Sequence, residues 1–187
     1  SMSNTRAAFP GSANLQIGRK SCIACAAALL TMLTLLVASS FADQPYAPDR
    51  DYDLTHARIE LRFDVDQRQV IGQVTHTLSA LHDGIAQLNF DSVDLNISAV
   101  QVDGKDARFS TDAQKLHVVL ATPSKAGQKY EVLIRYDGKP KKGLYFILPD
   151  KSRPNQTRQV WSQGEAEDTR YYIPIYDYPN DRTAFDM

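Results

Sequence analysis

The amino-acid sequence predicts an all-β protein, an antiparallel, saddle-like β-sandwich domain preceded by a signal-peptide helix. Apolar residues alternate with polar ones along several segments after residue 56, which is typical of strands with one buried face. Turn-forming residues separate these segments at short intervals. Beyond residue 42, no window of a dozen residues repeats its apolar positions at the helical period of 3.6. These three observations favour sheets packed on each other over any helical architecture.

The first 42 residues have the composition of a secretory signal. Arg19 and Lys20 precede an uncharged run over residues 21–42, whose centre is apolar and which ends in the small residues Ser40 and Ala42. This order predicts a signal peptide that is removed on export. The alternative is an uncleaved membrane anchor, because about 20 apolar residues can span a bilayer. Both interpretations place the protein outside the cytoplasm, periplasmic or secreted, and only the second brings it to a membrane.

A polar linker and a first hairpin follow. Residues 43–51 contain two prolines and read as a linker, and the domain is expected over residues 52–187. Residues 57–65 alternate strictly, which predicts a strand with five apolar positions on one face: Ala57, Ile59, Leu61, Phe63 and Val65. Residues 66–69 supply a turn, and residues 70–78 repeat the alternation as the partner strand.

The rest of the domain reads as shorter strands. They are expected at 88–90, 95–102, 116–120, 130–136, 143–147 and 160–162. Two of them run into Asp-Gly turns, at residues 103–104 and 137–138. The number of short strands and the spacing of the turns are those of an antiparallel sandwich.

Charge and motifs exclude several functions. The first 42 residues carry three bases and no acid, so the remaining 145 residues hold 18 basic and 22 acidic side chains, a net charge of −4. A mildly acidic domain lacks the strong positive charge with which proteins bind nucleic acids, so no nucleic-acid partner is predicted. None of the four histidines lies in an H-E-x-x-H motif, and Cys22 and Cys25 fall in the signal segment. We therefore assign no catalytic residue and no metal ligand to this chain.

The segment over residues 163–182 differs from the rest. It has no strand period and is rich in acids, tyrosines and prolines. It can display Gln163, Glu165 and Asp168 at the rim of a cleft. It can equally be a packed loop that closes the sandwich, with its acids solvated or paired to Arg170 and Arg182.

This segment carries a resemblance to a known family. The pattern Gln163-x-Glu165-x-x-Asp168-x-Arg170-x-x-x-Pro174-x-x-Asp177-x-Pro179 resembles the motif T-Q-x-E-x-x-x-A-R-x-x-F-P-C-x-D-x-P of the zinc aminopeptidases of the aminopeptidase N and leukotriene hydrolase (gluzincin) family. Other features occur in the same order, among them Gly143-Leu144-Tyr145 before the motif. Five motif positions differ, including Ser162 for Thr and Thr169 for Ala, which points to a divergent branch.

The resemblance implies a role for the chain and for two of its residues. It implies an N-terminal β-saddle domain that docks onto a thermolysin-like catalytic domain, with Gln163 and Glu165 binding the amino terminus of a peptide substrate. A carboxylate and an amide oxygen suit a cationic amine. The zinc-binding segments of the family follow this domain in sequence. Zinc is thus expected in the full-length protein and not in this chain, which alone is expected to be inactive.

Two hypotheses follow from the sequence. The first is the non-catalytic N-terminal domain of an exported zinc metalloaminopeptidase, a peptide hydrolase that removes N-terminal residues. The second is a free-standing secreted β-sandwich module for binding or adhesion, with the segment after residue 163 contacting a partner. An H-E-x-x-H motif downstream in the reading frame would distinguish the first from the second.

Overall fold

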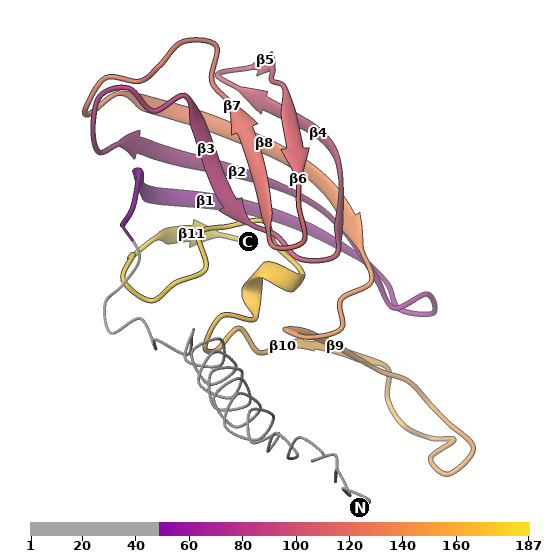
Figure 1. Cartoon of the computed structure of the whole chain (residues 1–187). Coiled ribbons are helices and arrows are strands. Elements are labelled where there is room, and N and C mark those ends of the chain that lie inside the picture. Colours follow the sequence, from indigo (N-terminus) through magenta and orange to yellow (C-terminus); the bar gives the residue numbers. More distant parts are fainter. Residues whose placement is uncertain (1–48) are drawn as a thin grey trace, which may run out of the picture. The chain divides into compact units, whose positions relative to one another are not determined.

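The chain folds as two packed β-sheets with a small third sheet beside them (Figure 1). A computed structural model of the protein describes residues 49–187. The predicted signal helix over residues 1–42, and most of the predicted linker at 43–51, lie outside the described residues. The described residues belong to one compact unit. The all-β, antiparallel prediction is confirmed.

The largest sheet has six strands in the order β11-β1-β2-β8-β4-β5. These strands are β1 (Tyr52–Asp64), β2 (Gln69–Ala80), β4 (Leu95–Val102), β5 (Lys105–Asp106), β8 (Lys129–Gly138) and β11 (Ala184–Asp186). All its pairings are antiparallel except that of β11 with β1. The predicted first hairpin is therefore present as β1–β2, although Val65 lies in the connecting turn rather than in the strand.

Two smaller sheets complete the domain. One contains β3 (Gln87–Asp91), β7 (Lys115–Val119) and β6 (Phe109–Thr111) in the order β3-β7-β6, and the other pairs β9 (Leu144–Ile147) with β10 (Gln159–Ser162). A short 3₁₀ helix, η1 (Thr169–Tyr171), follows β10. The three-stranded sheet covers one face of the six-stranded sheet, and β9–β10 projects from one end of the domain (Figure 1). The predicted strands are all found, whereas β5, β6 and β11 were not predicted.

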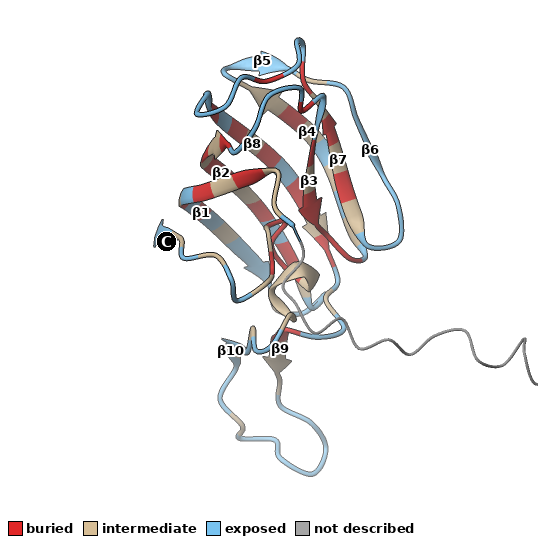
Figure 2. Ribbon diagram, turned by 60° about the vertical axis from the view of Figure 1, so that its left-hand side comes forward, coloured by how far each residue is buried: buried red, intermediate tan, exposed pale blue. Residues whose placement is uncertain are grey.

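The hydrophobic core lies between the six-stranded and three-stranded sheets. Fully buried side chains come from both layers and line their facing surfaces (Figure 2). They include Leu54, Val74, Ile134, Phe90 and Leu116. The alternation of β1 predicted this face, but burial declines along the strand from Ala57 (fully buried) to Phe63 (41% exposed). The far end of β1 therefore extends past the three-stranded sheet.

One close packing contact explains a glycine in the middle of β2. Gly72 lies directly opposite Tyr136 of β8, and a Cβ atom on Gly72 would come within 2.4 Å of the Tyr136 ring. The tyrosine ring thus covers the backbone that the glycine leaves open, an arrangement that stabilises glycine within a sheet.

Candidate functional site

The segment after β10 is a packed loop whose middle is buried against the sandwich. We call residues 163–178 the site loop. Backbone hydrogen bonds join it to β3 and to the residues after β3: Ile175 exchanges two with Asp91 (2.7 and 3.1 Å), and Val93 N–H donates to the carbonyl of Arg170 (3.0 Å). Tyr172, Ile173 and Pro174 are buried. Pro174 restricts the backbone of this stretch, and the Asp91–Ile175 bridge joins it to the sheet.

Arg170 organises the interior of the site loop. Its backbone N–H donates to Oδ2 of Asp177 (2.9 Å), and its guanidinium donates to Oδ2 (3.2 Å) and to the carbonyl of Asp177 (2.9 Å). The guanidinium also pairs with Glu167. One arginine therefore ties the two ends of the eight-residue stretch 170–177 together, using several of its five fixed donors.

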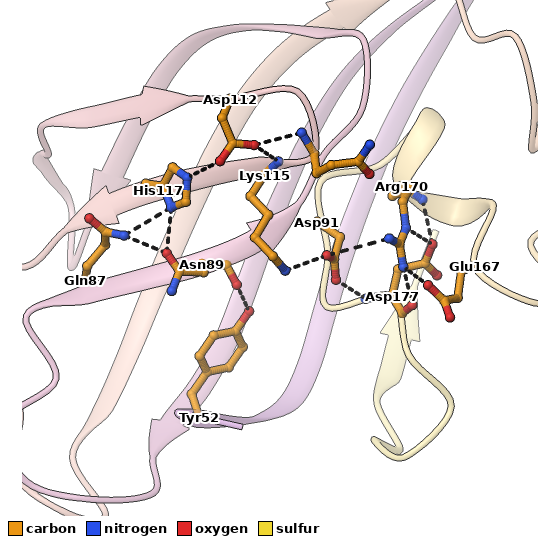
Figure 3. A network of polar contacts seen from close by, with 11 residues as sticks. Tyr52, Gln87, Asn89, Asp91, Asp112, Lys115, His117, Glu167, Arg170 and Asp177 are labelled. Atoms are coloured by element: carbon orange, nitrogen blue, oxygen red, sulfur yellow. Dashed lines mark hydrogen bonds and ion pairs between the residues drawn. The ribbon is translucent and has the colours of Figure 1, made fainter. Parts of the chain in front are cut away.

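Asp91 of β3 connects this loop to the sheet. Its carboxylate accepts from Lys115 Nζ of β7 (2.8 Å) and from the backbone N–H of Asp177 (3.0 Å), and it lies 3.9 Å from the Arg170 guanidinium. Only 9% of the Asp91 side chain is exposed. Burial lowers the pKa of Arg170, but the charges of Asp91, Asp177 and Glu167 outweigh burial and raise it. We call Asp91, Lys115, Glu167, Arg170 and Asp177 the charged cluster (Figure 3).

A second polar network lies beside the charged cluster on the three-stranded sheet. Nε2 of His117 lies 2.8 Å from Oδ2 of Asp112, and Nδ1 lies 2.7 Å from Oδ1 of Asn89. Tyr52 donates its hydroxyl hydrogen to the Asn89 carbonyl (2.7 Å), so β1 also joins the network (Figure 3). Hydrogen bonds from the backbone of Gln114, from His117 and from the backbone of Lys115 lower the pKa of Asp112 to about 2.

A cavity of about 540 Å³ opens beside both networks. Residues of β1, β3, β7 and the site loop line it, including Tyr52, Asn89, Lys115, Glu167 and Tyr178. Its walls carry charges of both signs together with aromatic rings. The cavity can accept a small polar molecule on geometric grounds, but the groups around it already bond mainly to one another.

The two residues predicted to bind substrate lie together at the start of the site loop. Gln163 and Glu165 are both exposed, and the peptide bond after Glu165 is cis. The backbone N–H of Gln163 donates to the carbonyl of Gly143 (2.8 Å), and that of Asp168 donates to the carbonyl of Gly164 (2.9 Å). The side chains of Gln163 and Glu165 make no hydrogen bond or ion pair to another of residues 49–187. The loop thus presents a carboxylate and an amide from a fixed backbone.

The alternative interpretation of this segment, a packed loop whose acids pair with arginine, also describes part of it. Glu167 and Asp177 pair with Arg170, while Asp168 lies 4.0 Å from Lys142. The loop therefore combines an internally paired half with an exposed start. Asp91 and Lys115 were not identified from the sequence, because nothing in their local pattern shows that the fold brings them to Arg170.

Residues 49–187 offer no metal centre and no membrane-spanning helix. In this range no three His, Cys, Asp or Glu side chains are grouped so that they could hold a metal ion. The same residues contain no helix with the length and apolar character needed to cross a bilayer.

Curated proteins with similar sequences are peptidases. The chain is 28% identical over 144 residues to leukotriene A-4 hydrolase of Xenopus laevis, which covers 72% of this chain and 23% of that protein. It is 25% identical over 158 residues to leucine aminopeptidase 2 of Yarrowia lipolytica, covering 77% of this chain and 24% of the relative. The chain thus spans about a quarter of the length of these relatives.

Solved structures with the same fold belong to similar enzymes. An M1 zinc metallopeptidase from Deinococcus radiodurans superimposes with a TM-score of 0.62 at 27% identity, covering 76% of this chain and 33% of that one. The leukotriene A4 hydrolase of yeast in complex with bestatin gives a TM-score of 0.66 at 22% identity over 81% of this chain and 26% of that one, which shows the shared fold.

The family assignment rests on the whole described region. Residues 49–187 match the model of the peptidase M1 N-terminal domain, and this range contains all three sheets and the site loop. The resemblance read from the Gln163–Pro179 pattern is confirmed: the chain belongs to the peptidase M1 N-terminal domain family.

Proposed function

We propose that this chain is the substrate-contacting N-terminal domain of an exported zinc aminopeptidase. Zinc chemistry and peptide cleavage would reside in a catalytic domain that follows it, as in the longer M1 zinc metallopeptidases to which it is similar. When bound there, zinc would polarise the scissile carbonyl and activate a water molecule. The contribution of the present chain would be to bind and orient the amino terminus of the peptide.

The observation that carries this proposal is the exposure of Gln163 and Glu165 on a loop that is otherwise fixed. The charged cluster and the Asp91–Ile175 bridge hold the later part of the loop in place, and the bond from Gln163 N–H to the Gly143 carbonyl holds its start, so the backbone that carries the two side chains needs little reordering to meet a ligand. Preorganised groups bind more tightly because less conformational entropy is lost. A free carboxylate beside an amide oxygen matches the charge and the donors of a protonated amine.

Kinetics of the full-length protein test this role. We expect Glu165→Gln to lower kcat/KM for peptides with a free amino terminus by roughly 10- to 100-fold, the value of one charge-assisted hydrogen bond. Gln163→Ala should cause a smaller loss in the same direction. Both variants should unfold at nearly the same denaturant concentration as the wild type, because both side chains are exposed and neither forms a hydrogen bond or ion pair with another described residue.

Glu167→Gln is the matched control. It removes a carboxylate from the same loop, but one that pairs with Arg170 rather than facing solvent alone. We expect it to reduce stability by about 1 kcal/mol or less, since the carboxylate is 44% exposed, and to change kcat/KM only slightly. Equal losses of kcat/KM in Glu165→Gln and Glu167→Gln would refute a specific role for Glu165.

The parent protein and its export can be tested separately. The reading frame beyond Met187 should encode H-E-x-x-H. A stop codon directly after Met187 would instead favour the free-standing binding or adhesion module. Mass spectrometry of the exported protein should find a mature chain that begins at Asp43, whereas retention of residues 21–42 would indicate a membrane anchor.

A further inference from the structure

Two aromatic side chains stack on the outward face of the β9–β10 hairpin. Tyr145 and Trp161 are directly paired across the two strands, with ring centroids 4.4 Å apart and planes inclined by 18°. Their neighbours Phe146 and Val160 face the opposite way and pack against the core. Trp161 remains 47% exposed. We call Tyr145 and Trp161 the aromatic shelf.

The aromatic shelf is continuous with the start of the site loop. Gln163 extends the pairing of β10 by its hydrogen bond to Gly143 (2.8 Å). Residues two apart on a strand share a face and lie roughly 7 Å from each other, so Gln163 follows Trp161 on the outward side. This spacing equals about two residues of an extended peptide. A peptide whose amine is bound by Gln163 and Glu165 would reach the shelf, which lies one such spacing from Gln163, with its second or third residue.

Cations surround the aromatic shelf. A groove of about 540 Å³ runs along the hairpin and is lined by Tyr145, Trp161 and three bases, with Asp150 as its one acid. The bases are Arg68, Lys141 and Arg153. Lys141 bonds to Asp94 (2.7 Å) and Arg153 to Asp150 (3.1 Å), whereas Arg68 forms no ion pair with another of residues 49–187. With Asp94 and Asp150 counted, the three bases leave an excess of one positive charge, that of Arg68, which favours a ligand that carries a carboxylate.

We propose that the aromatic shelf and the bases beside it form a subsite for the peptide beyond its first residue, selective for an aromatic residue followed by a carboxylate. The aromatic side chain would stack on Trp161, and the carboxylate would contact Arg68 and Arg153. Stacking and partial desolvation of the ring favour aromatic over small residues. The proposal rests on the proposed function in one respect, namely that the amino terminus of the peptide lies at Glu165.

Trp161 provides the measurement, because it is the only tryptophan in the 187-residue chain. The chain is titrated with the peptide Leu-Gly-Phe-Glu while tryptophan emission is recorded. We expect a saturable change with a Kd of about 1 mM, so that about 10 mM peptide approaches saturation. Replacing Phe by Ala in the peptide should weaken binding about fivefold, which corresponds to the loss of one aromatic contact.

Two arginines of one loop give a matched pair of variants. Arg153 lines the groove, whereas Arg158 pairs with Asp66 and does not. Arg153→Gln should weaken binding of Leu-Gly-Phe-Glu about threefold, as expected for one exposed ion pair, and Arg158→Gln should leave it unchanged. Tyr145→Ala should also weaken binding. Circular dichroism of each variant checks that the sheet is intact, so that a loss of binding can be attributed to the subsite.

The results separate this proposal from that of the amine site. An emission change that does not saturate, or that is equal for the Phe and Ala peptides, overturns the aromatic subsite. Glu165→Gln should weaken the free-amine peptide but not its N-acetylated form. If Glu165→Gln has no effect while the preference for Phe persists, the amine site is wrong and the aromatic subsite stands. If Glu165→Gln weakens binding but the Phe and Ala peptides bind equally well, the aromatic subsite is wrong and the amine site stands.

Discussion

At the scale of single residues, His76 stands out because it is the one buried histidine in residues 49–187. Its ring stacks on Phe90 with centroids 5.0 Å apart, and its Nε2–H donates to the carbonyl of Pro174 in the site loop (2.8 Å). Burial lowers the pKa of His76 from 6.5 to about 4, although the bond to Pro174 opposes this shift. The neutral ring thus joins β2 to the site loop.

This pKa shift predicts a pH dependence of stability. The unfolded chain takes up a proton at His76 near pH 6.5, while the folded chain does so only near pH 4. The free energy of unfolding should therefore fall as the pH drops through this window, by about 3 kcal/mol for His76 alone. Urea unfolding at several pH values measures the dependence, and His76→Gln should make it correspondingly shallower.

The surface histidine His82 is the control, because it is exposed and its ring nitrogens bond to Asp51 and to the backbone of Asp83 at the surface. His82→Gln should retain the pH dependence of the wild type, whose carboxylates also titrate in this range. A wild-type slope in His76→Gln would show that the buried ring does not cause the effect.

At the scale of elements, Gly143 fixes the junction between β9 and the site loop. Its φ is +74°, and a Cβ atom there would lie 2.0 Å from the carbonyl oxygen of Asp168. Its own carbonyl accepts from Gln163. Gly143 therefore allows the two chain segments to approach closely, just beside the exposed Gln163 and Glu165.

Two glycine-to-alanine variants separate the clash from the backbone conformation. Gly104 has the same φ of +74°, but its surroundings are open within 4 Å. Gly104→Ala should cost about 1 kcal/mol from the left-handed conformation alone. Gly143→Ala should cost roughly 2 kcal/mol more, because the loop must move to relieve the clash. Denaturant unfolding measures both values, and equal losses would contradict the packing role of Gly143.

The strands that the sequence predicted are those whose buried and exposed faces can be read from their own residues. Residues 57–63 of β1 and 70–78 of β2 alternate strictly and are joined by a short turn, so local pattern suffices. β11 has three exposed residues and pairs in parallel with β1, a partner more than a hundred residues away. Its formation depends on the completed sheet, and no periodicity in Ala184–Asp186 could reveal it.

The same distinction applies to the site loop. Gln163 and Glu165 could be selected as candidates because the motif that contains them is contiguous in sequence, and their role stays a prediction. Asp91 could not, because its contacts to Arg170 and Asp177 span about 80 residues and depend on the register of β3 with β7. Sequence thus revealed the exposed part of the loop, while the buried charges that support it required the fold.

At the scale of the whole molecule, exposed apolar side chains indicate where a further domain could dock. Phe63, Ile71 and Met187 line one hollow of about 730 Å³ on the six-stranded sheet, and each is more than 40% exposed. Such clusters mark interaction surfaces more often than scattered residues do. We expect amides of β1 and β2 around Phe63 and Ile71 to exchange more slowly in the full-length protein than in this chain.

Hydrogen exchange followed by mass spectrometry measures this difference. The strands β6 and β7, on the other sheet, serve as the internal reference and should exchange equally in both proteins. Unchanged exchange at β1 and β2 would place the docking surface elsewhere. The aromatic shelf should stay reactive toward a small quencher in both proteins if it is open to peptides.

Residues near the end of the chain bond to the outer edge of β1, and this has a consequence for how the domain folds during its synthesis. Asp181 accepts from the backbone N–H of Leu54 (3.1 Å) and pairs with Arg50 (2.6 Å), and Thr183 donates to the Leu54 carbonyl (2.9 Å). The inner edge of β1 pairs with β2, which is translated directly after it, but β11 and the residues before it, which cover the outer edge of β1, are translated last. This outer edge therefore stays open until nearly the whole domain has been translated. Exposed edges can pair with other chains, and this domain should therefore depend on chaperones until the final stage of its translation.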